Sequence, residues 1–414
     1  MPFQFCWMSS RKHSIFHQNV NNNESVLDVS MSSLPFQQPE SSVIGQIKVA
    51  FWNLQNLFDI EASQLASDLE FTPVHGWDRD TFEQKVRNLA DVIRQMFNGQ
   101  GPDLLGICEV ENERVANILV QAIGRDDYAV AHVEHPDIRG IDTSLIYSKK
   151  IFDFDKEKTK GHLVHLRYPT RDIFEVHLRV KQNESDLVVL VNHWPSRRAG
   201  RLESEPFRLT VASHCGKLVD DNLKLDRHQY LKLKDSDLSL FRLNNAWDRN
   251  VLVMGDLNDE PWDRSVREIL RSGYSVDHIE EPIRYSRGCL PSFRSYASKN
   301  ASLFNPMWSL MNQPDQGTHY YSKSVQTMNI LDQFVLSRGL YFGLQGLQVH
   351  QLNSMVPNVD VFRPEIMCTR KGRPRSFDRD NKSGFSDHFP ILTTMDVLKH
   401  VASSGGDSSL QDAA

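Results

Sequence analysis

The stretch Val251-Leu-Val-Met-Gly-Asp256-Leu-Asn258-Asp-Glu-Pro261 carries the clearest structural signal in the chain. Its first four residues are apolar and rich in Val, which predicts a strand that is buried on both faces. A glycine then opens a tight turn, and an acid and an amide follow at positions 256 and 258. α/β folds usually place their functional groups at the carboxyl end of such a strand. Considered alone, the stretch is explained equally well by an ordinary Asx-turn.

The composition of the 414 residues, 40% hydrophobic and 24% charged, is typical of a globular protein with a full core. The net charge of −6 excludes a global positive field that would recruit nucleic acid, so any polyanion site must be local. Five widely spaced cysteines without a Cys-x-x-Cys pair argue against a zinc site and a disulfide framework. We expect a cytoplasmic protein, because the chain lacks a membrane-span pattern and its amino terminus does not read as a signal peptide.

The domain organisation follows from where the composition changes. No internal repeat and no Pro/Gly/Ser linker divides the middle of the chain, which predicts one catalytic domain over residues 45–398. Residues 1–44 are rich in Asn, Ser and Gln, and we expect a disordered N-terminal extension there. A disordered tail is expected over residues 399–414. No obligate protein partner is evident in the sequence.

Hydrophobic periodicity predicts both strands and helices across this domain. Strands are expected at 46–52, 104–108, 128–133, 143–148, 172–180, 186–191, 251–254, 331–336 and 389–396. The clearest helix is expected at 78–97, and a shorter one follows residue 112 and ends at Gly124. Pro206 predicts the start of a long helical segment that runs to about residue 245. A further helix is expected to begin around Asp263.

Polar side chains lie at the ends of five of these strands and near a sixth. They are Asn53, Glu109, Asn192, His193, Asp256, Asn258, Asp332, Asp387 and His388. Any one of them alone is more simply explained as a turn residue whose hydrogen bonds are satisfied locally. Because six strand ends share this property, the sequence predicts that they meet in one site.

The chemistry of these side chains suits the hydrolysis of phosphoric esters. Glu109 and Asp387 offer hard oxygen ligands, which favour Mg²⁺ or Mn²⁺ over zinc. The neutral amides of Asn53, Asn192 and Asn258 can hold a phosphate or a metal-bound water without adding negative charge. The two histidines can donate hydrogen bonds to phosphate oxygens, and such catalysis consists mostly of positioning and charge stabilisation.

The order of these motifs resembles the endonuclease/exonuclease/phosphatase superfamily. The resemblance covers essentially all of residues 45–398, and the pair Gly255-Asp-Leu-Asn258 and Ser386-Asp-His388 is highly specific. The segments Arg139-Gly-Ile-Asp142 and Asn192-His-Trp-Pro-Ser-Arg-Arg198 are similar to bacterial predicted nucleases. The resemblance implies an α/β fold, a four-layer sandwich of two mostly antiparallel sheets flanked by helices, with the site at one end.

The resemblance also implies where a metal would bind. Glu109 would bind the ion, with Asn53 and Asp387 close by. Gln55 stands two residues after Asn53, where the abasic-site endonucleases of the superfamily tend to have an acid. This departure puts a second metal contact at that position in doubt.

Catalytic roles follow from the same resemblance. Asp256 would orient or deprotonate the attacking water, while Asn258 and His193 would hold the phosphate. His388, oriented by Asp332, would stabilise the transition state, because a neighbouring carboxylate favours the imidazolium form.

The substrate is less well defined by the sequence. Residues 363–382 contain seven Lys or Arg against three acids, which indicates either a solvated face or a contact for a polyanion such as DNA or RNA. The residues we predict to bind substrate are Arg139, Asn192, Arg197, Arg198 and Arg373. The sequence therefore predicts a metal-dependent nuclease. A phosphatase or phospholipase acting on a small molecule or lipid is the alternative, and an inactive binding module is disfavoured because every expected polar position is filled.

Overall fold

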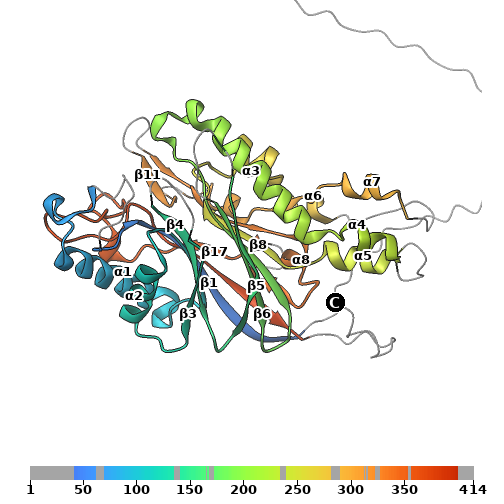
Figure 1. Cartoon of the computed structure of the whole chain (residues 1–414), viewed down its shortest axis with the longest axis horizontal. Coiled ribbons are helices and arrows are strands. Elements are labelled where there is room, and N and C mark those ends of the chain that lie inside the picture. The colour runs from blue at the N-terminus through green and yellow to red at the C-terminus, as the bar shows by residue number, and fades with distance from the viewer. Residues whose placement is uncertain are drawn as a thin grey trace, which may run out of the picture. The chain divides into compact units, whose positions relative to one another are not determined.

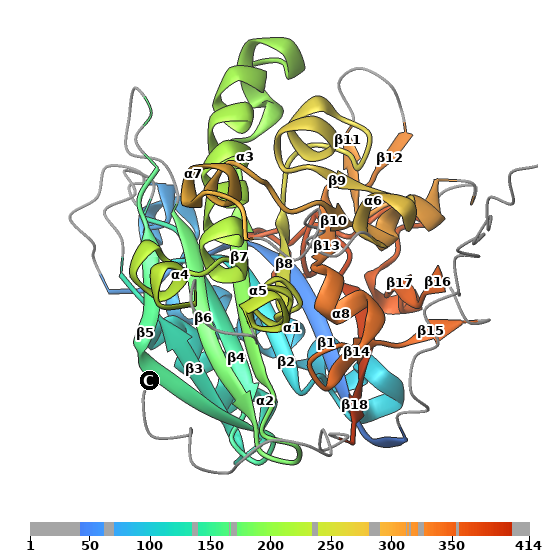
Figure 2. The same ribbon diagram turned by 90° about the vertical axis from the view of Figure 1, so that its right-hand side faces the viewer.

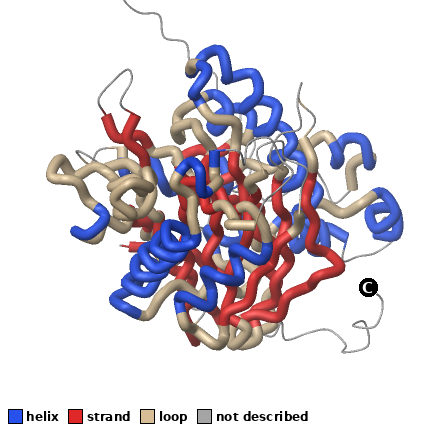
Figure 3. Tube along the Cα trace, turned by 60° about the vertical axis from the view of Figure 1, so that its left-hand side comes forward, coloured by secondary structure: helices blue, strands red, loops and turns tan. Residues whose placement is uncertain are grey.

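The computed structural model describes residues 42–399 except for 62–69, 135–139, 165, 167–171, 234–238, 281–289, 312, 314–315, 322–326 and 353–355. Two seven-stranded sheets organise these residues, with helices around them, as Figure 3 shows in red and blue. The strand Val43–Leu57 begins two residues before the predicted domain, so Val43 and Ile44 belong to a sheet and not to the N-terminal extension. Residues 1–41 of that extension and all but the first residue of the predicted tail lie outside the described residues.

The first sheet has the order β14-β18-β1-β2-β4-β3, with β17 also paired to β18. Its strands are β1 (Val43–Leu57), β2 (Leu104–Val110), β3 (Tyr128–His132), β4 (Asp142–Ser148), β14 (Leu347–Val349), β17 (Val359–Val361) and β18 (Ile391–Leu398). β1 and β2 run parallel, and the other described pairs of this sheet are antiparallel. The last strand of the chain therefore lies beside the first.

The second sheet has the order β5-β6-β7-β8-β13-β10-β9. Its strands are β5 (Phe152–His162), β6 (Ile173–Val180), β7 (Asp186–His193), β8 (Val251–Asp256), β9 (Ser272–Gly273), β10 (Leu303–Phe304) and β13 (Asp332–Leu336). β7 and β8 are parallel, as are β9 and β10, while the remaining described pairs are antiparallel. Both sheets are thus mixed but mostly antiparallel, as predicted.

The inner faces of the two sheets pack against each other to form the main core. Phe51 of the first sheet and Met254 and Phe334 of the second are fully buried in this core. The sheets approach closely at Gly106, where an added Cβ would lie 2.4 Å from the sulfur of Met254. No side chain larger than hydrogen fits there unless the Met254 side chain moves.

Helices cover the two outer faces. α1 (Arg79–Gly99) and α2 (Glu113–Ile123) lie on one side of the sheets, and α3 (Arg201–Leu223) and α5 (Ser239–Trp247) lie on the other (Figure 1). Figure 2 shows α3 and α5 beside β7 and β8, with the shorter α4 (Arg227–Leu233) next to them. The apolar residues of α3 pack on the outer faces of β7, β8 and β13 in a second core cluster. The structure is therefore the predicted four-layer α/β sandwich.

Three details of the prediction were wrong. Pro206 is the sixth residue of α3 and not its first, because Gly200 already ends the preceding turn and the helix starts at Arg201. The expected helix after Asp263 is only a five-residue stretch of π-helix at Ser265–Ile269. β5 was not predicted at all.

No helix in the described part of the chain combines the length and apolar character that crossing a membrane requires. The described cysteines, Cys108, Cys215 and Cys368, are free.

Candidate active site

The predicted strand ends from both sheets meet at one edge of the sandwich, with Asp256 at their centre. Its buried carboxylate accepts a hydrogen bond from the Asn53 amide at 3.1 Å through Oδ2. The Nε2 atoms of His193 and His388 lie 3.7 and 3.8 Å from the same oxygen. Asp256 Oδ1 accepts the backbone N–H of Asn258 at 2.9 Å, which fixes the carboxylate plane. These five residues come from four segments that are far apart in the sequence, and the fold brings them together.

His388 forms a buried ion pair with Asp332. Its Nδ1 lies 2.7 Å from Asp332 Oδ2, and Asp332 sits directly opposite Asp256 in the β8–β13 register. The hydroxyl of Thr318 accepts the backbone N–H of Asp332 and holds the start of that strand. Burial opposes the charged form, yet the carboxylates of Asp332 and Asp256 raise the pKa of His388 to about 10. His388 is therefore an imidazolium at neutral pH.

The pKa of Asp256 is raised above its usual value, toward neutral pH. Burial raises it to about 6, the charge of His388 opposes the shift, and the carboxylates of Asp332 and Glu109 add to it. A carboxylate with such a pKa can accept a proton near neutral pH.

The close approach of β7 and β8 requires Gly255, where φ is +157° and a Cβ would lie 2.2 Å from the Asn192 carbonyl oxygen.

Glu109, the second-last residue of β2, has a left-handed conformation, with φ of 62°. This conformation directs its side chain toward the irregular turn at Gln55–Asn56 near the end of β1, where Glu109 Oε2 accepts the backbone N–H of Asn56 at 2.8 Å. Glu109 Oε1 lies 3.5 Å from Nε2 of His193. Within the same turn, the backbone N–H of Gln55 donates to Asn53 Oδ1 at 2.9 Å. The ends of β1 and β2, which are parallel neighbours, thus hold each other in place.

The donor atoms at this edge fit a hard divalent cation. The side chains of Glu109 and Asp387 are 13% and 37% exposed, so both carboxylates are accessible from the site. Ligand atoms of His319, Asp387 and His388 lie within 4.8 Å of one another. Carboxylate and amide oxygens are the ligands that Mg²⁺ and Mn²⁺ prefer. Nδ1 of His388 is bound to Asp332, and the protonated ring has no free lone pair for a metal ion. The carboxylate oxygens of Glu109 and Asp387 are therefore better ligands than His388.

His319 belongs to the site although no sequence pattern predicted it. It starts β11 (His319–Tyr321), which pairs with β12 (Thr327–Asn329), and it forms an isolated β-bridge with His388. The two imidazole rings lie 4.5 Å apart, and Nε2 of His319 is 4.0 Å from Asp387. Burial and the charge of His388 lower the pKa of His319 to about 4, so it is neutral beside an imidazolium. Its segment has no apolar periodicity, so only the fold reveals it.

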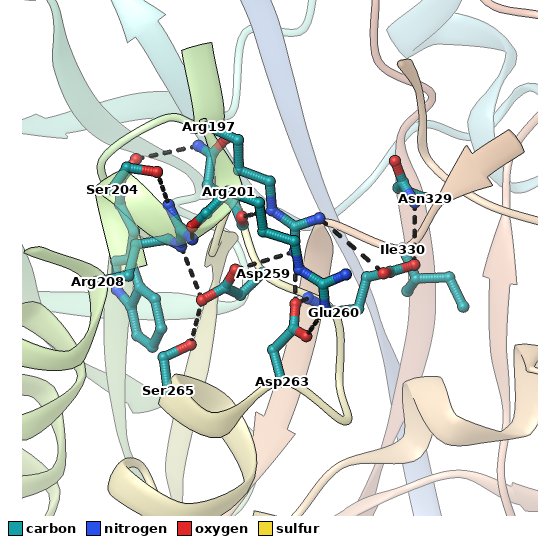
Figure 4. Close-up of polar contacts among 12 residues, drawn as sticks. Arg197, Arg201, Ser204, Arg208, Asp259, Glu260, Asp263, Ser265, Asn329 and Ile330 are labelled. Atoms are coloured by element: carbon teal, nitrogen blue, oxygen red, sulfur yellow. Dashed lines mark hydrogen bonds and ion pairs between the residues drawn. The ribbon is translucent and has the colours of Figure 1, made fainter. Parts of the chain in front are cut away.

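Arg197, which we predicted to bind substrate, is held by the loop that follows β8 (Figure 4). Its Nε donates to the Asn258 carbonyl oxygen, and its Nη2 pairs with Asp259 at 2.9 Å and with Asp263 at 2.5 Å. Arg208, fully buried in α3, pairs with Asp259 from the other side at 2.7 Å. These contacts indicate that Arg197 positions Asn258; direct contact with substrate stays a prediction.

The other predicted substrate residues have different outcomes. Asn192 is fully buried on the opposite face of β7 from His193, with its amide bonded to Leu190 and to the Trp194 indole, so its predicted substrate contact was wrong. The reason is the alternation of side chains along a strand. Arg198 is exposed at the rim. Arg139 lies outside the described residues.

The basic segment 363–382 borders the site. The backbone N–H of Phe377 donates to Gln55 Oε1 at 2.8 Å, which joins the segment to the turn at Gln55–Asn56 near the end of β1. Arg373 lies over the ring of Tyr320 at 3.6 Å, next to His319. The guanidinium of Arg379 likewise lies over an aromatic ring, that of Phe71, at 4.1 Å. The segment is therefore neither a free flexible arm nor remote from the predicted metal ligands.

The sandwich, its gathered oxygen donors and its acid-paired histidine are those of a phosphoric ester hydrolase. A model of the Endonuclease/Exonuclease/phosphatase family matches residues 48–397, and the chain belongs to this family. Enzymes of the family are generally dependent on a divalent metal. A comparison with curated proteins finds no match.

Several solved structures are similar to this chain. An endonuclease/exonuclease/phosphatase family protein from Bacteroides thetaiotaomicron has 13% identity and a TM-score of 0.47, covering 86% of this chain and 99% of its own. The mannosyl-6-phosphatase of the same organism has 14% identity and a TM-score of 0.46, covering 84% and 99%. The human Nocturnin catalytic domain has 14% identity and a TM-score of 0.44, covering 85% and 94%.

Proposed function

We propose that this protein is a nuclease that hydrolyses DNA or RNA with the help of Mg²⁺ or Mn²⁺. The observation that carries the proposal is the attachment of the basic segment 363–382 to the predicted metal site, through the hydrogen bond between Phe377 and Gln55. A nucleic-acid backbone lying across the site would meet this segment, since it is long and carries one negative charge per nucleotide.

The chemistry that this proposal assigns to the site is an in-line attack of water on phosphorus. Asp256 accepts the proton of the attacking water while the new O–P bond forms, and a pKa of about 6 suits this role. On the opposite side of phosphorus the P–O ester bond breaks, and the leaving oxygen takes up a proton from solvent to give the free hydroxyl product. The negative charge that develops on the phosphoryl oxygens is stabilised by the His388 imidazolium and by His193 and Asn258. When bound, the cation would lie against Glu109 and supply Lewis-acid stabilisation of the same charge.

The partners of the basic side chains support a polymer as the substrate. Arg370 and Lys371 are exposed at the tip of the segment, where phosphates can reach them. Arg373 and Tyr320 form a half-buried stacked pair beside His319. An arginine over an aromatic ring is a surface on which an unpaired base can stack. A small phosphorylated substrate has no need of contacts this far along the segment.

The test is the salt dependence of DNA and RNA binding after four cations of the segment are changed to Ser. The changed residues are Arg370, Lys371, Arg373 and Arg375. Each lost phosphate contact should lower the slope of log affinity against log salt by about 0.7–0.9. Turnover of bis-nitrophenyl phosphate, a minimal diester, should barely change because the segment lies outside the metal site.

A matched control removes four exposed cations from the edge strand β5 and the turn that precedes it. These are Lys149, Lys150, Lys156 and Lys158. The control variant should keep the wild-type slope. An unaltered slope in the basic-segment variant would contradict the nucleic-acid contact. Loss of affinity for a small phosphorylated ligand, with no DNA or RNA binding by the wild type, would favour the phosphatase alternative.

A further inference from the structure

Lys85 is a buried cation behind the predicted metal site. It lies on the inner face of α1, and only 2% of it is exposed. Its ammonium donates to the carbonyl oxygen of Gln55 and lies 3.5 Å from that of Asn56. Burying a charged amine is costly unless its donors are satisfied. The position of Lys85 therefore needs an explanation beyond the packing of an amphipathic helix.

The turn that Lys85 contacts has an unfavourable backbone. Gln55 and Asn56 both have left-handed conformations, with φ of 56° and 55°, and Glu109 opposite them has φ of 62°. Non-glycine residues adopt this region at a cost of roughly 1–3 kcal/mol each, so surrounding contacts must impose it. The turn is nevertheless what directs the Asn56 N–H to Glu109 Oε2 at 2.8 Å. The carbonyl groups on its other side are the ones that Lys85 holds.

The surroundings of the ammonium also link it to the metal ligands. The rings of Phe377 and Trp77 lie 5.1 and 5.8 Å from Nζ and shield it from water. Burial lowers the pKa of Lys85 to about 7, while the carboxylates of Glu109 and Asp387 act in the opposite direction. Both carboxylates predicted to bind the cation are thus close enough to interact with this charge.

We propose that Lys85 is a positioning residue of the metal site, which holds the Gln55–Asn56 turn in the conformation that aims Glu109 at the cation. This inference rests on the proposed function of the site. The competing account is that Lys85 only adds positive charge beside the ligands. The two accounts predict opposite signs, because removing a positive charge alone would strengthen cation binding, whereas losing the turn would weaken it.

The experiment measures Mn²⁺ binding to the metal-free full chain by calorimetry, with the free-ion electron paramagnetic resonance signal as a second readout. Lys85→Met should raise the dissociation constant by about 10–100-fold, the range expected when a group that orients a metal ligand is lost. Arg87→Met is the matched control, since Arg87 is an exposed cation two residues along α1 that pairs with the exposed Glu83. It should leave the constant within about twofold of wild type.

A rescue variant separates positioning from a general loss of structure. Glycine adopts the left-handed region without cost, so Asn56→Gly should need less help from Lys85. In that background, Lys85→Met should weaken Mn²⁺ binding by less than about threefold, a coupling that independent effects would not give. If Lys85→Met does not fold, Lys85→Gln, whose amide still donates to a carbonyl, takes its place in both backgrounds.

The outcomes distinguish the inference from the function on which it rests. Unchanged or tighter Mn²⁺ binding by Lys85→Met, with normal binding by the wild type, would overturn the positioning role alone. If Lys85→Met reduced the affinity for Mn²⁺ equally in the wild-type and Asn56→Gly backgrounds, the positioning role would be overturned as well. A wild-type protein that binds neither Mn²⁺ nor Mg²⁺ would overturn the proposed function together with the inference.

Discussion

Replacing Asp332 by Asn tests the central electrostatic feature of the site. Asn keeps the shape of the side chain and can still accept the hydrogen bond from His388 Nδ1, but the buried negative charge at 2.7 Å disappears. Asp332 is the strongest of the carboxylates that hold the pKa of His388 at about 10 instead of 6.5. In the variant, burial lowers and Asp256 raises that pKa, so we expect it to return to the neighbourhood of 6.5.

The size of the effect depends on pH in a way that a general loss of folded enzyme would not reproduce. At pH 8, a pKa of about 10 leaves about 99% of His388 charged, and a pKa of about 6.5 leaves about 3%, which is a loss of about 30-fold in the active form. At pH 6 the corresponding loss is only about 1.3-fold. The pH profile of kcat should therefore lose its alkaline side in the variant. The acid side, set by Asp256, should move to lower pH, because the Asp332 carboxylate that helps to raise the pKa of Asp256 is gone.

The measurement combines pH–rate profiles with an NMR titration of the His388 ring in the metal-free protein. The same shift affects stability, because a pKa that is raised on folding means that protonation stabilises the folded state. That contribution is complete below pH 6.5 and is lost as the pH rises through about 10, so Asp332→Asn should flatten the loss of stability over this window. An alkaline limb and a ring titration that are both unchanged would refute the reasoning.

Three further substitutions test other parts of the site. Asp256→Asn should reduce turnover by at least about 100-fold with the fold intact, since the water loses its proton acceptor; near-normal turnover would make the assignment wrong. Glu109→Gln should raise the Mg²⁺ concentration that gives half-maximal activity by at least about tenfold, and unchanged dependence would remove this residue from the metal site. Arg197→Gln removes one of the two cationic partners from each of the buried carboxylates Asp259 and Asp263, which keep Arg208 and Arg201. It should cost about 2 kcal/mol in urea unfolding, whereas the exposed Arg198→Gln should cost less than about 0.5 kcal/mol. Equal costs would contradict the positioning role of Arg197.

The sequence predicts the sheets well because their strands have strong local signals. The Val-rich run at β8 and the regular apolar alternation of β6 leave little choice of structure. The turn acids and amides were predicted because they follow those strands directly. By contrast, β5 is largely exposed, with a pattern that alternates poorly, so its pairing with β6 depends on tertiary contacts.

The parts of the site that could not be predicted are those in which the direction of a side chain determines whether the residue faces the site. Asn192 and His193 are both polar and adjacent, so the sequence shows that they face opposite ways but not which one faces the site. Lys85 did leave a signal, because it lies three residues after Phe82 and four before Leu89 on the apolar stripe of α1. A lysine on such a stripe indicates a buried amine, but its partners Gln55 and Asn56, near the end of β1, are revealed only by the fold.

The pairing of β18 with β1 has a consequence for when the protein acquires activity during its synthesis. Asn53 is made early and His388 almost last, and the strand that follows His388 completes the sheet beside β1. A chain emerging from the ribosome therefore lacks the ion pair between His388 and Asp332 until nearly the whole sequence is available. Such long-range closure slows folding, and it also means that the activity proposed for this site would be absent from the nascent protein.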